Sequence, residues 1–288
     1  MKFFCFGFGQ VAKYFVKKLL KENYTLELNV SSRQKTQTKT FEGLNFNSYE
    51  FSNKKIDKDI NAKIKEADFI LVSIPPIEGK DIVINNLKKV IKNTQTKWIT
   101  YLSATSVYGN HNGKWVNENS ETKPTTVNGI NRLKAEEQWL KYVKENNLPL
   151  QIFRLSGIYS DQKNIFKRIN AGEAKIVKKE KHFFSRVHIE DIANVLFHSL
   201  RKFKRNEIFN ISDNYPSSQE EIAYYGFKLL KLDPPSLTKL DHLEDGMLKD
   251  FYKESKKVDN KKMKEFFNYK LTYPTYKEGL NNIFNNIV

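Results

Sequence analysis

Short apolar runs alternate with amphipathic segments along the first half of the chain. Runs that predict buried strands cover residues 2–6, 25–30, 68–74, 98–102 and 150–155. Segments with a helical spacing of apolar residues lie between them, at residues 10–22, 60–66, 82–92 and 130–146. Apolar strands separated by helices are typical of a parallel sheet that is covered on both faces. The pattern therefore predicts an α/β fold, a Rossmann-like doubly wound parallel sheet.

The pattern loosens after about residue 160. It predicts helices at 163–171, 190–202 and 219–231, a strand at 207–211, and a polar, helical stretch over the last 55 residues. We interpret residues 1–158 as a nucleotide-binding core. Residues 159–288 then form a mixed segment that completes the core and builds a smaller C-terminal substrate lobe.

Composition narrows the class of protein. The hydrophobic fraction of 39% is enough for a packed core, and no run of about 18 apolar residues exists to span a membrane. Cys5 is the single cysteine, which excludes a disulfide within the chain and fits a reducing cytoplasm. The five histidines are dispersed without the spacing of a metal site, so we expect no bound metal.

The formal charge is +16, but the basic residues are scattered among acids, as in KKIDKDINAKIKEAD. Scattered charge is the ordinary pattern of solvated helix faces, so a nucleic-acid or membrane partner is the less favoured interpretation. A basic surface still suits a small ligand that carries phosphate.

The first strand leads directly into GFGQVA and then a helix. Gly7, Gly9 and Ala12 fit the pattern G-x-G-x-x-G/A, in which glycines allow a tight turn and a close approach to a pyrophosphate. Gln10 and Val11 open the helix whose N-terminus would face that anion. The alternative is a glycine-containing turn without a ligand.

The end of the second strand discriminates between cofactors. An acid there would bind the ribose 2′-hydroxyl of NAD, but the sequence has Ser31, Ser32 and Arg33. Arg33 suits a 2′-phosphate, so we predict NADP, with NAD as the alternative cofactor and a solvated Arg33 as the structural alternative. Ser73, Ile74 and Pro75 end a buried strand at the same predicted edge of the sheet and would line the cofactor crevice.

Further motifs resemble the extended short-chain dehydrogenase/reductase superfamily, of the NAD-dependent epimerase/dehydratase kind. They are YLSATSVYG at 101–109, WVNENSETKP at 115–124, RLSGIYS at 154–160 and RVHIEDIANVL at 186–196. SIPP at 73–76 and LTYPTYKEGL at 271–280 are similar to a bacterial subgroup of nucleoside-diphosphate-sugar-epimerase-like proteins. The resemblance implies that Ser103 and Ser156 lie at the cofactor.

The reaction centre of that superfamily is a Ser or Thr, a Tyr, and a Lys four residues after the Tyr. The matching positions here are Ala104 (with Thr105 beside it), Asn128 and Arg132. Arg132 is cationic and can bond ribose hydroxyls. Asn128 can bond a substrate oxygen but cannot carry a proton, and loss of a positioned general acid costs about 10²–10⁴ in rate.

Tyr108, Tyr159, His111 and Thr105 are candidates to replace the missing proton donor, and Tyr108 is the first choice among them. The alternative for Tyr108 is a structural role, because the superfamily signature has a Tyr at this position even where the usual triad is intact. His188 and Asp191 more often serve as a loop anchor and a helix cap at such a spacing than as a catalytic pair.

We therefore expect an NAD(P)-dependent oxidoreductase or epimerase that acts on a sugar-like or nucleotide-sugar substrate, as a cytoplasmic monomer or homodimer. The main alternative is an NADP(H)-binding protein without turnover, with a redox-sensing or regulatory task. An RNA-binding member of the superfamily is a weaker third interpretation.

Overall fold

The computed structural model describes residues 1–242 and 252–287 and divides the chain into two compact units. Unit 1 consists of residues 1–104, 130–154 and 192–209, and unit 2 of residues 105–129, 155–191 and 210–288. The chain thus passes several times between the two units, so neither is a single continuous segment.

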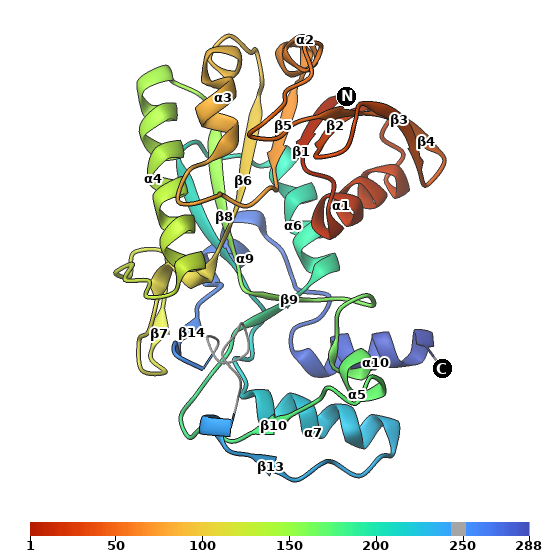
Figure 1. Cartoon of the computed structure of the whole chain (residues 1–288), viewed down its shortest axis with the longest axis vertical. Coiled ribbons are helices and arrows are strands. Elements are labelled where there is room, and N and C mark those ends of the chain that lie inside the picture. Colours follow the sequence, from red (N-terminus) through yellow and green to blue (C-terminus); the bar gives the residue numbers. More distant parts are fainter. Residues whose placement is uncertain (243–251, 288) are drawn as a thin grey trace. The chain divides into compact units, whose positions relative to one another are not determined.

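Unit 1 is built on a large sheet whose strands follow the order β12-β8-β6-β5-β1-β2-β4-β3 (Figure 1). The strands are β1 (Lys2–Phe6), β2 (Glu27–Ser32), β3 (Gln37–Phe41), β4 (Leu44–Glu50), β5 (Phe69–Val72), β6 (Trp98–Ala104), β8 (Leu150–Leu155) and β12 (Glu207–Ile211). The pairs β1–β2, β1–β5, β2–β4 and β5–β6 are parallel. The predicted α/β fold with a Rossmann-like, mostly parallel sheet is confirmed.

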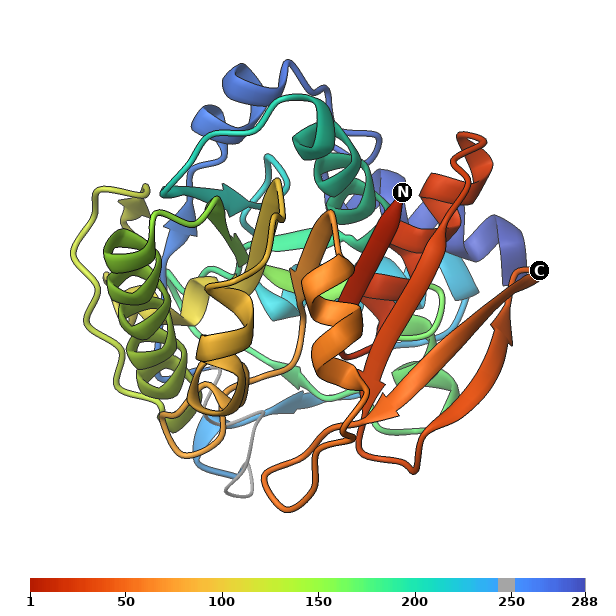
Figure 2. The ribbon, with the colours of Figure 1, turned by 90° about the horizontal axis from the view of Figure 1, so that it is seen from above.

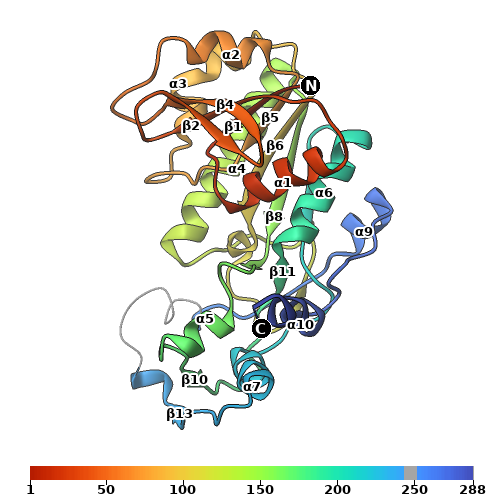
Figure 3. The same cartoon turned by 90° about the vertical axis from the view of Figure 1, so that its right-hand side faces the viewer.

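Helices cover both faces of this sheet, as Figures 2 and 3 show. The helices are α1 (Gln10–Lys21), α2 (Ile60–Glu66), α3 (Ile82–Ile91), α4 (Val127–Asn146) and α6 (Ile189–Arg201). On one face, the ring of Phe15 from α1 packs on Phe3 and Trp98, and the Trp98 indole donates to Ser199 of α6. The alternation of helix and strand in the sequence therefore predicts the layers correctly.

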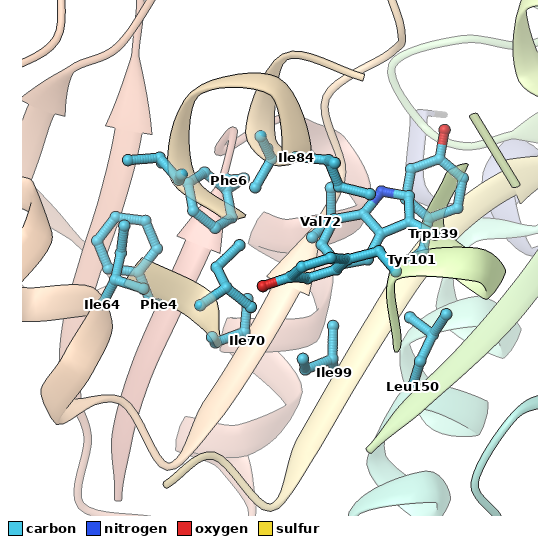
Figure 4. Close-up of a cluster of buried hydrophobic side chains, with 14 of the residues drawn as sticks. Phe4, Phe6, Ile64, Ile70, Val72, Ile84, Ile99, Tyr101, Trp139 and Leu150 are labelled. Atoms are coloured by element: carbon cyan, nitrogen blue, oxygen red, sulfur yellow. The ribbon is translucent and has the colours of Figure 1, made fainter. Parts of the chain in front are cut away.

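The opposite face of the sheet carries a large buried cluster (Figure 4). Phe4, Phe6, Ile70, Val72 and Ile99 point from the strands into this layer, where they meet side chains of α2, α3 and α4. Tyr101 and Trp139 pack with ring centroids 6.0 Å apart and join β6 to α4. Burial of these large side chains is the main favourable contribution to the stability of this unit.

The hairpin formed by β3 and β4 lies between residues 30 and 60, where the apolar pattern predicts no element. Its polar side chains face solvent at the edge of the sheet, so apolar periodicity is weak there. The turn does carry a signal: Glu42 and Gly43 have φ of 49° and 76°, the two positive values that a type I′ hairpin turn requires. Gly43 between two stretches of alternating polarity is the sequence signal for this hairpin.

Unit 2 contains short strands and several helices. The strand pairs are β9 (Gly157–Tyr159) with β11 (Arg186–His188), β10 (Ile176–Val177) with β13 (Leu237–Thr238), and β7 (Trp115–Val116) with β14 (Lys257–Val258). The helical elements are η1 (Thr105–Tyr108), α5 (Ile165–Asn170), α7 (Gln219–Leu230), η2 (Leu240–His242), α9 (Lys261–Phe267) and α10 (Tyr276–Ile287). Apolar side chains of α5, α7 and α10 share one core.

The helices predicted at 163–171 and 219–231 correspond to α5 and α7, and the helical C-terminal stretch corresponds to α9 and α10. Residues 243–251 of that stretch lie outside the described residues. None of the helices that the structure describes is long and apolar enough to cross a membrane.

Candidate functional site

The loop after β1 is held in a conformation that requires glycine. Gly7 has φ of +85°, and a β-carbon there would lie 2.6 Å from Cγ2 of Ile74. The Gly7 amide donates to Oγ of Ser31 at 3.2 Å, and Oγ of Ser73 donates to the carbonyl oxygens of Phe6 and Gly7 at 2.9 and 3.1 Å. Side chains from β2 and from the end of β5 therefore fix this turn from both sides.

The N-terminus of α1 follows directly and is open to a ligand. Gly9 is its N-cap and provides no side-chain cap, and the first turn of the helix has no acid. A β-carbon at Gly9 would have nothing within 4 Å, while Ala12 is fully buried against the sheet. A helix N-terminus favours an anion, so this clearance leaves room for a phosphate group.

The three residues at the end of β2 differ in the hydrogen bonds that their side chains form within the protein. Ser31 is buried and accepts from Gly7. Ser32 accepts from the amide of Gln34 at 3.2 Å and from Oγ of Ser48 at 3.1 Å. Arg33 is exposed, and none of the described residues forms a hydrogen bond or ion pair with it. Arg33 thus retains its full capacity for an anion.

The other cofactor candidates of unit 1 lie at the same edge. Ile74 packs against Gly7, and Pro75, which follows it, is exposed. Gln10 and Val11 are half-buried in the first turn of α1. Ser103, near the end of β6, is buried, and its Oγ has no hydrogen-bond partner in the described structure. Unit 1 therefore brings these residues together at the carboxyl ends of β1, β2, β5 and β6.

Arg132 is tied to the sheet by its side chain. Its Nη1 donates to the carbonyl oxygen of Leu102 on β6 at 2.7 Å. Burial raises the pKa of Tyr101, and the nearby charge of Arg132 opposes that rise. Asn128 is exposed one turn earlier on α4. Arg132 therefore joins α4 to β6, whatever further donors it offers to a ligand.

Tyr108 and His111 are engaged within unit 2. The Tyr108 side chain is completely buried, and its hydroxyl donates to Oδ1 of Asn210 at 2.7 Å. Nε2 of His111 lies 3.1 Å from the carbonyl oxygens of both Tyr108 and Glu121, a geometry in which a protonated Nε2 joins two parts of one loop. Thr105 is also buried. This geometry favours the structural interpretation of Tyr108.

The remaining candidates of unit 2 surround the β9–β11 pair. Ser156 is buried, and its amide donates to the carbonyl oxygen of Ile211 at 3.0 Å. The His188 ring lies between the rings of Tyr159 and Tyr273, with centroids at 5.1 and 4.0 Å. Burial lowers the pKa of His188 to about 4, and its Nδ1 accepts from the amide of Glu190. His188 is thus a neutral ring in a packed aromatic environment at neutral pH.

Asp191, in the first turn of α6, anchors the segment before α10. Its carboxylate accepts from the Tyr269 hydroxyl at 2.5 Å and from the amides of Thr272 and Tyr273 at 2.8 and 3.0 Å. Burial raises its pKa, and these three hydrogen bonds oppose the rise. We expected Asp191 to cap α6, but the hydrogen bonds of its carboxylate go to the segment before α10.

Sequence reasoning missed Arg186 and Asp213. Arg186 donates to the carbonyl oxygens of Phe184 and Ser217, to Oγ of Ser217 and to Oε1 of Gln219, all within 3.1 Å. Burial raises the pKa of Asp213 to about 8, although Arg186 lies near it, and its Oδ2 has no partner in the described structure. An Asp in a turn after a strand is ordinary in sequence, so no signal distinguished Asp213.

Comparison with known proteins gives a partial family match and identifies the fold. The NAD dependent epimerase/dehydratase family matches residues 81–212. A conserved protein of unknown function from Silicibacter pomeroyi DSS has a similar structure, with a TM-score of 0.85 and 29% identity over 99% of this chain and 98% of its own. No curated protein matches the chain.

Two further solved structures, each in complex with NAD, share the fold. UDP-glucuronic acid 4-epimerase from Bacillus cereus has a TM-score of 0.77 and 17% identity, and the match covers 100% of this chain and 99% of that one. dTDP-glucose 4,6-dehydratase from Bacillus anthracis has a TM-score of 0.77 and 18% identity, with 99% and 96% covered. At these identities the likeness shows the fold alone.

Proposed function

We propose, from the match of residues 81–212 to the NAD dependent epimerase/dehydratase family and from the shared fold, that this chain binds NADP(H) at the carboxyl edge of the unit 1 sheet. The proposed activity is that of an oxidoreductase or epimerase on a sugar-like or nucleotide-sugar substrate. A bound nicotinamide would supply hydride transfer. The residues of the chain would bind the pyrophosphate, select the 2′-phosphate and orient the ring.

The exposed and unpaired Arg33 is the observation that carries the choice of NADP. It follows β2 at the position where an acid would favour the ribose hydroxyls of NAD, and no described residue neutralises it. The Gly7–Gly9 loop and the open N-terminus of α1 fit a pyrophosphate, and the buried, unpartnered Oγ of Ser103 fits a hydrogen bond from a ligand. These observations support the site but do not depend on the identity of the substrate.

The proposed reaction requires a proton donor, and few side chains near the predicted site are suited to that role. Asn128 stands where relatives of the superfamily have a Tyr, and it has no ionisable proton. The hydroxyl of Tyr108 is already bonded to Asn210, and His111 bridges two carbonyl oxygens. Thr105 remains a candidate, but a hydroxyl of ordinary acidity is a weak general acid at neutral pH.

The engagement of these side chains favours a second candidate function, NADP(H) binding without turnover. Such a protein would use the cofactor as a redox signal or as a structural ligand. It keeps every feature of the unit 1 site and needs no proton donor, so the geometry of unit 1 alone does not separate it from an enzyme.

Titration with NADPH and with NADH, followed by nucleotide fluorescence, tests the cofactor site. We expect tighter binding of NADPH, and we expect Arg33→Ala to weaken NADPH by about tenfold to a hundredfold while NADH changes little, because only the 2′-phosphate contact is lost. Lys144→Ala removes an exposed cation from the far end of α4 and serves as the control for net charge. Tighter binding of NADH by the native protein would reject NADP as the preferred cofactor.

Turnover is tested separately, by following NADPH absorbance in the presence of carbonyl compounds and by following nucleotide-sugar isomers by chromatography. Consumption of NADPH or interconversion of isomers identifies an enzyme. Tight NADPH binding without either signal favours the non-catalytic function.

A further inference from the structure

The segment from Gly7 to Gly9 carries one side chain, that of Phe8. Gly7 is bracketed by Ser31 and Ser73, but Gly9 has neither a side-chain cap nor a neighbour within 4 Å of a β-carbon. Phe8, which joins the two glycines, is half-buried. The Phe8 ring is therefore a side-chain anchor next to the Gly9 backbone, while Ala12 and Phe15 anchor α1 itself.

Phe8 packs against both strands of the β3–β4 hairpin. Its ring centroid lies 5.4 Å from that of Phe41 on β3, edge to face at 89°, and 5.0 Å from that of Phe46 on β4. Edge-to-face and tilted contacts at these distances are favourable and depend on orientation. The hairpin thus holds Phe8 with a defined direction and not only by apolar burial.

The hairpin is also joined to α1, on the other side of the same loop. Nζ of Lys17 lies 3.3 Å from the Glu42 carboxylate at the hairpin turn, and Nζ of Lys13 lies 5.9 Å from the Phe41 ring centroid. Figures 1 and 3 show α1 beside β3 and β4. The hairpin, Phe8 and the first turns of α1 therefore form one packed group around the loop.

The same hairpin determines where Arg33 lies. Arg33 follows β2, and residues 33–36 connect β2 to β3. Residues 29–32 of β2 pair with residues 47–50 of β4, so both ends of this connection are fixed by the hairpin. One element at the edge of the sheet thus supports the phosphate loop and the cation that follows β2.

We propose that the β3–β4 hairpin is a positioning element of the dinucleotide site, acting through the Phe8 ring held between Phe41 and Phe46. This inference rests on the proposed function. Displacement of the hairpin shifts the Gly9 backbone away from the pyrophosphate, and a shift of about 1 Å is enough to weaken an oriented interaction strongly. Because the pyrophosphate is common to both cofactors, the effect extends to NADH and NADPH alike.

The test compares Phe41→Ala and Phe8→Ala with Phe69→Ala, in titrations with both dinucleotides and in thermal unfolding. Phe69 is a matched control, because it is also half-buried and has two aromatic neighbours, Phe3 and Trp98. It is the first residue of β5 and therefore lies at the amino end of the strand, away from the proposed dinucleotide site. We expect all three variants to unfold at lower temperature. We expect only Phe41→Ala and Phe8→Ala to lower the affinities for NADPH and NADH, each by about tenfold. Phe41→Tyr keeps the aromatic ring and should keep the native affinities.

The milder Phe41→Leu, with an intermediate loss of affinity, replaces Phe41→Ala if the latter does not fold. Affinities of the Phe41 and Phe8 variants equal to that of Phe69→Ala would overturn the positioning role and leave the proposed function intact. If the native protein binds neither dinucleotide, the proposed function fails, and the positioning role fails with it.

Discussion

The predicted site residues of unit 1 and those of unit 2 are both rich in polar side chains, but the two groups use their hydrogen bonds differently. In unit 1, Ser31 and Ser73 hold the backbone of Gly7, while Arg33 forms no hydrogen bond or ion pair with a described residue and Gly9 caps α1 without a side chain. In unit 2, Tyr108 is buried and bonded to Asn210, and the three hydrogen bonds of Asp191 hold the segment before α10.

This difference shows which candidates are free to act on a ligand. A ligand-binding edge needs donors or charges that the fold has not already satisfied, and Arg33 of unit 1 provides such a charge. A side chain whose polar atoms are already paired inside the fold must break those bonds before it can act, at a cost of about 1–3 kcal/mol each when buried. Unit 1 therefore carries the stronger functional assignment.

Replacement of Gly7 should have the largest effect on binding. In Gly7→Ala the new β-carbon meets Ile74, and the positive φ costs about 1–2 kcal/mol in addition, so we expect dinucleotide affinity to fall roughly a hundredfold or more. Gly172→Ala is the control, because Gly172 has φ of +69° but an open β-carbon position after α5. Dinucleotide titration and urea unfolding of both variants separate the effect of backbone strain on stability from the effect of a displaced loop on binding. Equal dinucleotide affinities of the two variants would argue against a binding site in unit 1.

Asp213 tests whether the buried polar groups of unit 2 reduce its stability. Its folded pKa of about 8 exceeds the ordinary value of 3.8, so the folded protein retains a proton that the unfolded chain releases. Stability from this group is full below pH 3.8 and declines by about 1.4 kcal/mol per pH unit until pH 8.

Asp213→Asn removes that ionisation and retains a side-chain oxygen for the amide of Tyr215. We expect urea unfolding to show the variant more stable than the native protein at pH 8 and the advantage to shrink at pH 5. Asp233→Asn, at an exposed aspartate of the same unit, is the control. A difference that is constant with pH would show that Asp213 is ionised in the folded protein.

Tyr108→Phe should have the smallest effect on stability and binding. It tests directly whether the paired polar groups of unit 2 are structural. Loss of the hydrogen bond to Asn210 is expected to lower the free energy of unfolding by about 1 kcal/mol, measured by urea unfolding. Dinucleotide affinity, and kcat if turnover is found, should stay unchanged. A hundredfold fall in kcat without a change in affinity would assign the proton donor to Tyr108 after all.

The layered α/β fold and the glycine-containing turn between β1 and α1 are both predictable from the amino-acid sequence. Both depend on local patterns: apolar runs that become β1, β5, β6 and β8, and a glycine pair placed between a strand and a helix. Such patterns are readable because strand and helix periodicities and the conformational freedom of glycine act over a few residues. The hairpin after β2 was missed because its exposed edge leaves little apolar periodicity to detect.

Which polar side chains remain available to a ligand depends on contacts between segments that are far apart in the sequence. Tyr108 meets Asn210 across 102 positions of sequence, and Tyr273 meets Asp191 across 82, so neither engagement has a local signature. Phe8 likewise finds Phe41 and Phe46 through strand pairing at the edge of the sheet. Burial and hydrogen bonding of this kind depend on contacts between distant segments, and spacing along the chain does not encode them.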